Sequence, residues 1–287
     1  MKNFSYNENI DSLDVSDLYV ADGLKHAQKK GLKRIRILKD PLSSGTVLDL
    51  SSLAGNATIE SLNISQDINL KKVDFSPLYK CSSLEELMTP YTRKAIEFKK
   101  LPRLRTLYLS SATDEIADLH LAHVTDLLIV GARNKNLDFL AAPNLRLLRL
   151  SGGSLESLQG LEKCQSLREL GISHCSKMSS IEVLRDLGLV KLSVEKCKLL
   201  RDYSVLSDHP SMEELFVSEL DSLAFVTSMR KIERIKFWSV SDGDLSPLLA
   251  SSTLKAVDFY PQKKHYTHTN DQINSLLRSV APRHLPS

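Results

Sequence analysis

The sequence contains few of the residues that stabilise small secreted domains. Only four of its 287 residues are cysteine, and it has a single tryptophan. Its start, MKNFSYNENIDSLD, has no basic region followed by an apolar run. Such a start lacks the pattern of a secretory signal or a membrane span, and scattered cysteines in that context are kept reduced. We therefore expect a cytoplasmic protein with free thiols and no membrane contact.

Charge of one sign is also not in excess. The chain has 38 Lys and Arg against 35 Asp and Glu, a net charge of +3, and 42% of its residues are hydrophobic. A balanced surface of this kind does not attract polyanions over long distances. We therefore expect no nucleic-acid partner.

Signatures of catalysis or metal binding are scarce as well. The stretch SGGS at 151–154 lacks the lysine and the strand–loop–helix setting of a phosphate-binding loop. His265, His268 and Asp271 are ligand types, but zinc needs three or four converging ligands and no partner cluster is visible. The sequence thus predicts no catalytic residue, no metal and no cofactor.

An apolar rhythm is present along most of the chain. The pattern leucine-x-x-leucine-x-leucine, with Ile, Val, Met or Phe allowed in the apolar slots, begins at eleven places, and Thr89 alone breaks its last slot. A possible earlier copy starts at Ile10. A second apolar patch precedes most copies by about eight residues, as in LDLSSL and LAFVTS. The eleven copies start at Leu32, Ile59, Leu84, Leu104, Val124, Leu145, Leu167, Leu189, Met212, Ile232 and Leu254.

This rhythm predicts a stack of similar coils. A coil of about 22 residues has too little volume to bury its own apolar side, so each coil packs against its neighbours. The second and third apolar residues of each copy alternate with others, as the residues of a strand do. We therefore expect one parallel strand per coil, with the apolar residues turned inward and the residues between them turned outward.

The period and the leucine core resemble those of the leucine-rich repeat family, over residues 32–260 and, with the earlier copy, from residue 10. The resemblance implies an α/β solenoid with a curved parallel sheet on its concave face, short turns and 3₁₀ pieces on its convex face, and helical end caps. One departure stands out. The Asn or Cys that usually follows the strand is present only as Cys175 and Cys197, so the turns must satisfy their backbone groups in another way.

The ends of such a stack need covering, which predicts three segments. Residues 1–31 form an amino-terminal cap, 32–260 the repeats, and 261–287 a cap helix with a disordered tail from 282. The first cap helix is expected over 16–31, capped by Ser16, stopped by Gly31, and packed through Leu18, Ala21 and Leu24. The second is expected to pack through Ile273, Leu276, Leu277 and Val280, with Asn270 as its cap and Pro282 as its stop.

The outward strand positions are the candidate binding residues. The amino-terminal strands place Arg34 and Arg36 there, and acidic residues follow in the middle. Towards the carboxyl-terminal end, three aromatic residues lie beside cations, which is the composition of interface hot spots; packing of Trp238 or Tyr260 beneath the cap helix is the alternative. The candidate set is Arg34, Arg36, Glu86, Tyr108, Asp126, Arg149, Glu169, Lys191, Glu214, Phe216, Arg234, Lys236, Trp238 and Tyr260.

We therefore expect a module that binds a protein partner along the concave sheet. The chain is also similar to stand-alone bacterial leucine-rich repeat proteins that act as cytosolic immunity proteins, which implies a toxin domain as the partner and occlusion as the mechanism. A regulatory scaffold or adaptor, or an injected effector, is the alternative. An enzyme whose site spans several coils, for example with Glu169 and Glu195, is a third hypothesis. Cys175 and Cys197, in equivalent slots, are interpreted as buried and inert.

Overall fold

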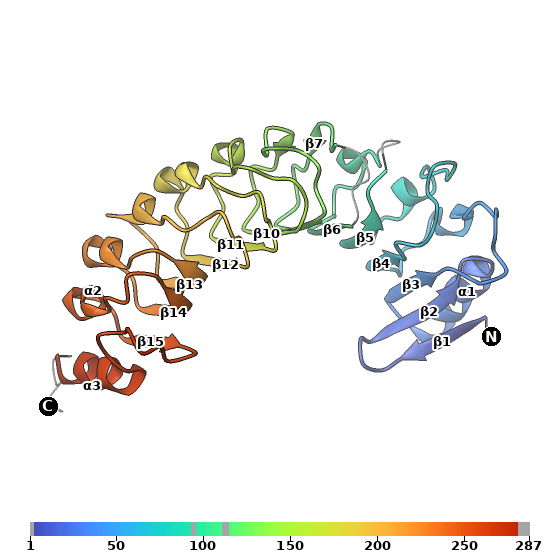
Figure 1. Ribbon diagram of the computed structural model, residues 1–287. Coiled ribbons are helices and arrows are strands. Elements are labelled where there is room, and N and C mark those ends of the chain that lie inside the picture. Colours follow the sequence, from blue (N-terminus) through green and yellow to red (C-terminus); the bar gives the residue numbers. More distant parts are fainter. Residues whose placement is uncertain (1–2, 93–95, 111–114, 281–287) are drawn as a thin grey trace, which may run out of the picture. The chain divides into compact units, whose positions relative to one another are not determined.

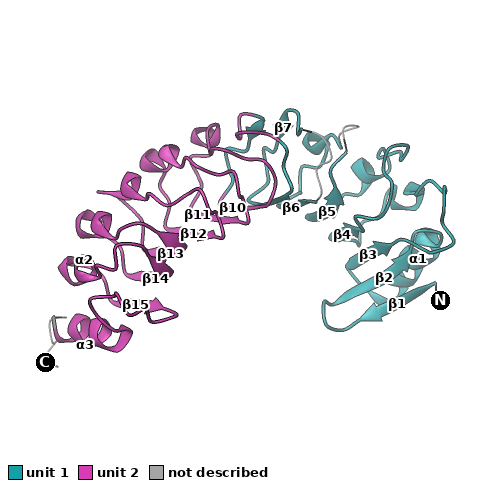
Figure 2. Ribbon diagram, in the orientation of Figure 1, with its two compact units in different colours: residues 1–133, 139–145 teal, residues 134–138, 146–287 magenta. Residues whose placement is uncertain are grey.

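The computed structural model describes residues 3–92, 96–110 and 115–280 (Figure 1). The chain divides into two compact units (Figure 2). Unit 1 comprises residues 1–133 and 139–145, and unit 2 comprises 134–138 and 146–287. The predicted division into two caps and a repeat region stays a prediction, and the predicted tail from Pro282 lies outside the described residues.

The sheet of unit 1 is built from the amino-terminal copies of the repeat. Its main strands run in chain order, and each pair from β2 onward is parallel, whereas β1 pairs with β2 in the antiparallel direction. A separate two-stranded parallel ladder joins β7 to β9 on another side of the coils. The strands are β1 (Phe4–Asn7), β2 (Ser12–Ser16), β3 (Arg34–Leu38), β4 (Ser61–Ile64), β5 (Glu86–Pro90), β6 (Thr106–Ser110), β7 (Leu119–His120), β8 (Asp126–Val130) and β9 (Leu140–Ala141).

The sheet of unit 2 continues the same rule through the later copies, and all of its neighbouring strands are parallel. Successive strands pair residue by residue without offset. Equivalent residues of successive copies therefore form straight rows across the sheet. The strands are β10 (Leu147–Ser151), β11 (Glu169–Ser173), β12 (Lys191–Glu195), β13 (Glu214–Leu220), β14 (Arg234–Val240) and β15 (Ala256–Phe259).

The alternation predicted for the strands is confirmed. In β3, Ile35 and Ile37 are buried while the residues between them are half-buried, and Leu170 and Ile172 of β11 repeat the pattern. Thr89, the residue that breaks the apolar rhythm, is also buried, and its hydroxyl donates to the carbonyl of Pro90 at 3.2 Å. Each buried aliphatic side chain contributes on the order of 1.5–3 kcal/mol. The core of each unit is therefore the sum of many equivalent coil contacts.

Short turns cover the side of each coil opposite the strands, as predicted (Figure 1). They coincide with the second apolar patch of the repeat, and residues such as Leu53 and Leu78 bury it. In unit 1 the 3₁₀ turns are η1 (Ser51–Leu53), η2 (Leu78–Lys80) and η3 (Phe98–Lys100). In unit 2 they are η4 (Leu161–Lys163), η5 (Glu182–Asp186), η6 (Ser204–Leu206) and η7 (Ala224–Ser228), followed by one short helix, α2 (Ser246–Ala250).

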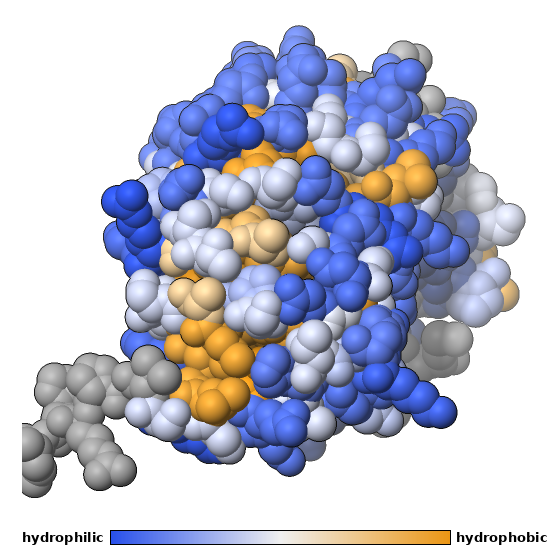
Figure 3. Space-filling view, turned by 60° about the vertical axis from the view of Figure 1, so that its left-hand side comes forward, coloured by the Kyte–Doolittle hydropathy of each residue, from blue (hydrophilic) through white to orange (hydrophobic). Residues whose placement is uncertain are grey.

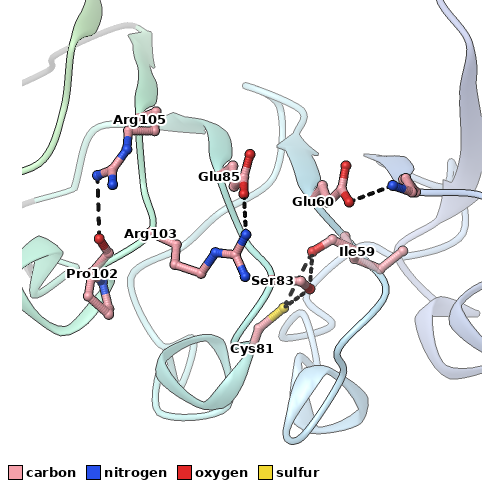
Figure 4. Close-up of polar contacts among 9 residues, drawn as sticks. Ile59, Glu60, Cys81, Ser83, Glu85, Pro102, Arg103 and Arg105 are labelled. Atoms are coloured by element: carbon pink, nitrogen blue, oxygen red, sulfur yellow. Dashed lines mark hydrogen bonds and ion pairs between the residues drawn. The ribbon is translucent and has the colours of Figure 1, made fainter.

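Polar contacts also join successive coils, as a close-up in unit 1 shows (Figure 4). The Ser83 hydroxyl donates to the carbonyl of Ile59, 2.7 Å away and one coil earlier, and the Cys81 thiol points at the same oxygen from 3.8 Å. On the surface, Arg103 forms an ion pair of 2.5 Å with Glu85. The buried hydroxyl thus satisfies a backbone carbonyl of the preceding coil.

The amino-terminal cap differs in part from its prediction. The helix α1 (Val20–Lys30) begins four residues later than expected, because Ser16 ends strand β2 and its hydroxyl accepts instead from the backbone NH of Leu18 at 3.3 Å. Gly31 ends the helix in the left-handed conformation, with φ 67°, as predicted. The shift changes the buried face: it consists of Val20, Gly23, Leu24 and Ala27, while Leu18 and Ala21 are exposed.

The carboxyl-terminal cap is the helix α3 (Asn270–Val280), and its cap was predicted one residue too late. The hydroxyl of Thr269 accepts from the backbone NH of Gln272 at 3.2 Å, and the Gln272 side chain accepts from the NH of Thr269 at 2.7 Å. These reciprocal bonds make a capping box. Ile273 and Leu277 are buried as expected, whereas Leu276 is 43% exposed, so only part of the predicted apolar face packs inward.

The helix α3 also closes the last strand of unit 2. The side-chain amide of Asn274 donates to the carbonyl of Val257 at 2.7 Å and accepts from the NH of the same residue at 3.0 Å. Val257 lies in the edge strand β15, and this pair of bonds replaces those of a further strand. A covered edge is protected from pairing with other chains.

The turns that lack asparagine are satisfied in two ways. In unit 1, Asp40 is buried, and its carboxylate accepts from the Ser16 hydroxyl at 3.0 Å and from the NH of Leu42 at 2.9 Å. In unit 2, β13 and β14 are two residues longer than most strands, and their register continues to Leu220 opposite Val240. Strand pairing there takes over the backbone groups that an asparagine would otherwise bond.

Candidate functional site

The last four strands of unit 2 bring five of the candidate residues together in two rows. Their register aligns Lys191, Glu214 and Arg234 in one row, with Ala256 at its end. A second row aligns Phe216 with Lys236 and Asp258. Because side chains at alternate positions of a strand point to one face, both rows stand on the outward face of the sheet.

Glu214 is the electrostatic centre of the first row. Its carboxylate lies 3.2 Å from Lys191 Nζ and also accepts a hydrogen bond from the guanidinium of Arg234. The two cations, with Arg234 the stronger influence, hold the pKa of Glu214 below its usual value, and the same contact raises the pKa of Arg234. Glu169 of β11 stands opposite Lys191, so the row alternates two acids with two bases.

A hollow of about 300 Å³ opens between the two rows. Its surface is largely apolar, and the buried core residues Leu192, Leu215, Ile235 and Val257 lie beneath it where the strands begin. Its rim is charged, and there Lys236 Nζ lies 2.8 Å from the carboxylate of Asp258. Ala256 ends the first row with a small side chain, which leaves the hollow open on that side.

Two of the three predicted aromatic residues meet beside the hollow. The rings of Phe216 and Trp238 pack edge to face, with centroids 5.6 Å apart at 65°. Tyr260 follows β15 and is 79% exposed, and the ring contacts found in the described part of the chain do not include it. Tyr260 therefore stays a predicted binding residue that does not share the ring contact of the other two.

The aromatic packing under the cap helix is made by other residues. Phe237 and Phe259 stack with centroids 4.9 Å apart, and Tyr266 packs edge to face against Phe259 at 5.5 Å. The hydroxyl of Tyr266 accepts from the NH of Val240 at 3.1 Å. Trp238 is half-buried on the opposite face of its strand from Phe237, so its place in the fold is set by Phe216 and not by the cap.

Two further candidates of unit 2, Arg149 and Glu169, are exposed on β10 and β11. Arg149 stands opposite Gly171, and a Cβ added at this glycine would lie 3.4 Å from Arg149 Cγ. The register places Glu195 opposite Ser173, four residues along the strand from Glu169, which is about 13 Å at strand spacing. The pair named for an enzyme site is therefore not brought together.

The candidate cations of unit 1 are held in ion pairs. Arg36 donates two hydrogen bonds to the carboxylate of Asp14, from Nε at 2.9 Å and from a terminal nitrogen at 2.6 Å. Arg34 lies 3.1 Å from Glu86, two strands along the sheet. The amino-terminal end is therefore less basic than the sequence predicted, because the acids that neutralise it come from other coils.

The remaining candidates of unit 1 lie on the central strands of its sheet. Asp126 accepts a hydrogen bond of 2.9 Å from the hydroxyl of Thr125. Tyr108 is half-buried on β6, opposite Met88 of β5. Both side chains stand on the outward face, and neither lines a hollow described for this protein.

The paired cysteines are buried thiols in adjacent coils. Cys175 donates to the carbonyl of Gly152 at 3.3 Å, and Cys197 points at the carbonyl of Glu195 from 3.6 Å. The hydrogen bond with Cys197, together with burial, raises the pKa of the Cys175 thiol. A protonated, buried thiol is a poor nucleophile and a poor metal ligand.

Over residues 3–92, 96–110 and 115–280, no three His, Cys, Asp or Glu side chains converge as a metal site would require. Within the same part of the chain, no helix has the length and apolarity needed to cross a membrane.

Comparison with known proteins bears on the fold. A crystal structure of an internalin from Listeria monocytogenes strain 4b F2365 matches this chain with a TM-score of 0.55, over 82% of this chain and 70% of the internalin. The sequences are 20% identical, so the likeness concerns the fold alone. The chain has the leucine-rich repeat fold.

Sequence comparison adds a shorter match to a protein of the same repeat type. The human leucine-rich repeat-containing G-protein coupled receptor 6 is 35% identical over 83 residues, which span 27% of this chain and 9% of the receptor. The match thus covers a small part of each protein. No known family model matches the sequence.

Within the leucine-rich repeat fold, the sequence missed the acids and small residues that shape the candidate surface. Asp14 and Asp258 complete ion pairs, and Ala256 leaves the hollow open, yet none stood out by residue type. Alignment of the copies does place Ala256 and Asp258 at outward positions of the last strand. Charge complementarity between equivalent slots of neighbouring copies is the signal that finds Asp258.

Proposed function

We propose that this chain binds a protein partner through the outward sheet face of unit 2, with the hollow between the rows as its anchor point. The observation that supports the proposal is the combination of an apolar floor, a charged rim and the adjacent Phe216–Trp238 pair. Interfaces concentrate their affinity where an aromatic or aliphatic anchor fills a pocket and polar groups surround it. The leucine-rich repeat fold supplies the rigid rows on which such a site stands.

The remaining candidate residues have a secondary role in this proposal. Salt-bridged side chains on an exposed face orient a partner and affect its association rate, but they add little affinity. We assign this role to the paired residues of unit 1, and an orienting role also to the exposed Arg149, Glu169 and Tyr260 of unit 2.

The resemblance to stand-alone bacterial repeat proteins supports a more specific hypothesis. In it the partner is a toxin domain, and the chain acts as a cytosolic immunity protein that covers the toxin's active site or substrate entry. Occlusion needs affinity and shape, and it requires no chemistry from this chain. A sheet face with an anchor hollow is suited to that role.

An affinity capture with three baits tests both the binding of a protein partner through the hollow and the more specific immunity role. The wild-type chain and the Ala256→Trp variant, whose indole fills the hollow, are compared for the proteins they retain. Leu199→Trp is the control, because Leu199 is 61% exposed on a turn outside the sheet face. Ala256 and Leu199 are both exposed, so both variants should fold, which circular dichroism verifies.

The expected result is a partner retained by the wild type and by Leu199→Trp and lost by Ala256→Trp. Retention of the same partner by all three baits would overturn the proposal that the hollow is the anchor point. A captured protein whose toxicity is relieved when this chain is co-expressed supports the immunity role, and a captured housekeeping protein supports the adaptor alternative instead.

A further inference from the structure

A second, larger hollow lies on unit 2 beside the starts of its last strands. It measures about 620 Å³ and is lined in part by the residues that directly precede β13, β14 and β15, and in part by helix α3. The residue that follows each of these, at the start of the strand, lines the sheet hollow instead. The two hollows are therefore neighbours on different faces. We call the larger one the lateral hollow.

The lateral hollow has an apolar wall. Leu254 and Leu277 are buried at its base, whereas Leu249 is half-buried and Leu276 is 43% exposed. Figure 3 views this end of unit 2 and shows hydrophobic side chains gathered in a patch at the lower left. Leu276 lies on the face of α3 that the sequence predicts to be buried. Leu276 thus extends the apolar wall of the lateral hollow to the protein surface.

Cations exceed anions around the lateral hollow. Arg230, Lys231, Lys255 and Arg278 line it together with Glu213 and Glu233, which is four cations against two anions. Lys255 is neutralised by Glu233 at 2.6 Å. Among the described residues, Arg230, Lys231 and Arg278 form no ion pair, so their charge is available to a ligand.

We infer that the lateral hollow docks an acidic, leucine-bearing segment of a protein partner. Leucine side chains match the apolar wall, and carboxylates match the three unpaired cations. A second copy of this chain fits poorly, because the same cations would face one another across the contact. The inference goes beyond the proposed function, since it concerns a different face and stands whether or not the sheet hollow is used.

Fluorescence anisotropy with a labelled synthetic peptide tests the inference on the full chain. The probe repeats Glu-Glu-Leu-Leu four times, and its partner probe repeats Lys-Lys-Leu-Leu. We expect saturable binding of the acidic probe, at least about tenfold tighter than that of the basic probe. Arg278→Glu and Leu276→Glu should each weaken it about tenfold, whereas Lys198→Glu, an exposed cation away from the hollow, should not change it.

Other outcomes overturn the inference. Equal affinity for both probes, or no response to Leu276→Glu in a folded variant, removes the charge or the apolar part of the argument. Self-association seen by sedimentation, abolished by Arg278→Glu, assigns the hollow to a second copy. Binding that appears only after deletion of 281–287 assigns it to the chain's own end. Ala256→Trp separates the two surfaces, since it should leave probe binding unchanged even if partner capture fails.

Discussion

The outward faces of the two units use the same kinds of residue in different ways. In unit 1, Arg36 is held by Asp14 in a two-pronged pair whose acid side chain is only 14% exposed, and Arg34 is matched to Glu86. In unit 2, Glu214 is shared between two cations, and an apolar hollow opens beside it. Matched pairs stabilise the coils, whereas an apolar hollow with a charged rim is suited to a partner. The difference teaches that outward position alone does not identify a binding residue.

The largest expected effect concerns the aromatic pair of unit 2. Phe216→Ala and Trp238→Ala should each weaken partner binding by about 2 kcal/mol, or about 30-fold in Kd, because each removes anchor area beside the hollow. Tyr108→Ala, a half-buried outward aromatic of unit 1, should change Kd less than about threefold. Isothermal titration calorimetry with the captured partner measures all three. A larger loss from the Tyr108 variant would reverse the assignment of the two faces.

The next effect separates structural from functional ion pairs. Arg36→Met leaves the half-buried Asp14 without its two bonds, and we expect a loss of about 2 kcal/mol in the free energy of unfolding. Arg234→Met should cost less than about 1 kcal/mol, because Arg234 is largely exposed and Glu214 keeps Lys191. Urea unfolding of both variants makes the comparison. Similar losses would show that the pairs of the two faces do not differ.

Arg36 and Phe216, which appear in these two predictions, show how much of the site could be predicted from the sequence alone. The alternation of apolar and polar residues identified the strands and placed Arg36 and Phe216 outward. It did not pair Arg36 with Asp14, because the copy that begins at Ile10, which puts the two residues in equivalent slots, was only a possible one. Nor did it reveal the hollow, which depends on the small side chain of Ala256 at the end of a row. The local apolar pattern thus predicts which side chains point outward, whereas the ion pairs and the hollow depend on contacts between coils.

The start of α1 illustrates the same limit. Ser16 has the chemistry of a helix cap, but the copy that begins at Ile10 extends the sheet to include it as the last residue of β2. Pairing with β3 thus overrides a local preference. The missing asparagine ladder was visible in the sequence, whereas its replacement by longer strands in unit 2 required the register.

Acid should weaken unit 2 through a buried histidine. His209 is 2% exposed, its Nδ1 accepts from the NH of Met212 at 3.2 Å, and its Nε2 lies 3.2 Å from the carbonyl of Leu184. Burial lowers the pKa of His209, so the folded state favours the neutral ring. The unfolded chain takes up a proton below about pH 6.5, so this stabilisation is complete above that pH and is lost as pH falls through the lower folded-state pKa.

The slope of unfolding free energy against pH checks this prediction. Between about pH 6.5 and 5, the wild type should lose at most about 1.4 kcal/mol per pH unit from this group. His209→Gln should be less stable at neutral pH but should show a shallower slope over the same interval. An unchanged slope in that variant would assign the acid sensitivity to other groups.

The smallest expected effect comes from exchanging an exposed pair on the rim of the sheet hollow. Lys236 and Asp258 are each more than half exposed, so the double variant Lys236→Asp with Asp258→Lys should alter the free energy of unfolding by less than about 0.5 kcal/mol. The exchange moves the rim charges without filling the hollow, and partner affinity should fall about fivefold at low salt and less at high salt. The matched exchange in unit 1, Arg34→Glu with Glu86→Arg, should leave affinity unchanged. If the unit 1 exchange has the larger effect on affinity, the partner contacts the face where the charges are matched, and the hollow of unit 2 is not its anchor.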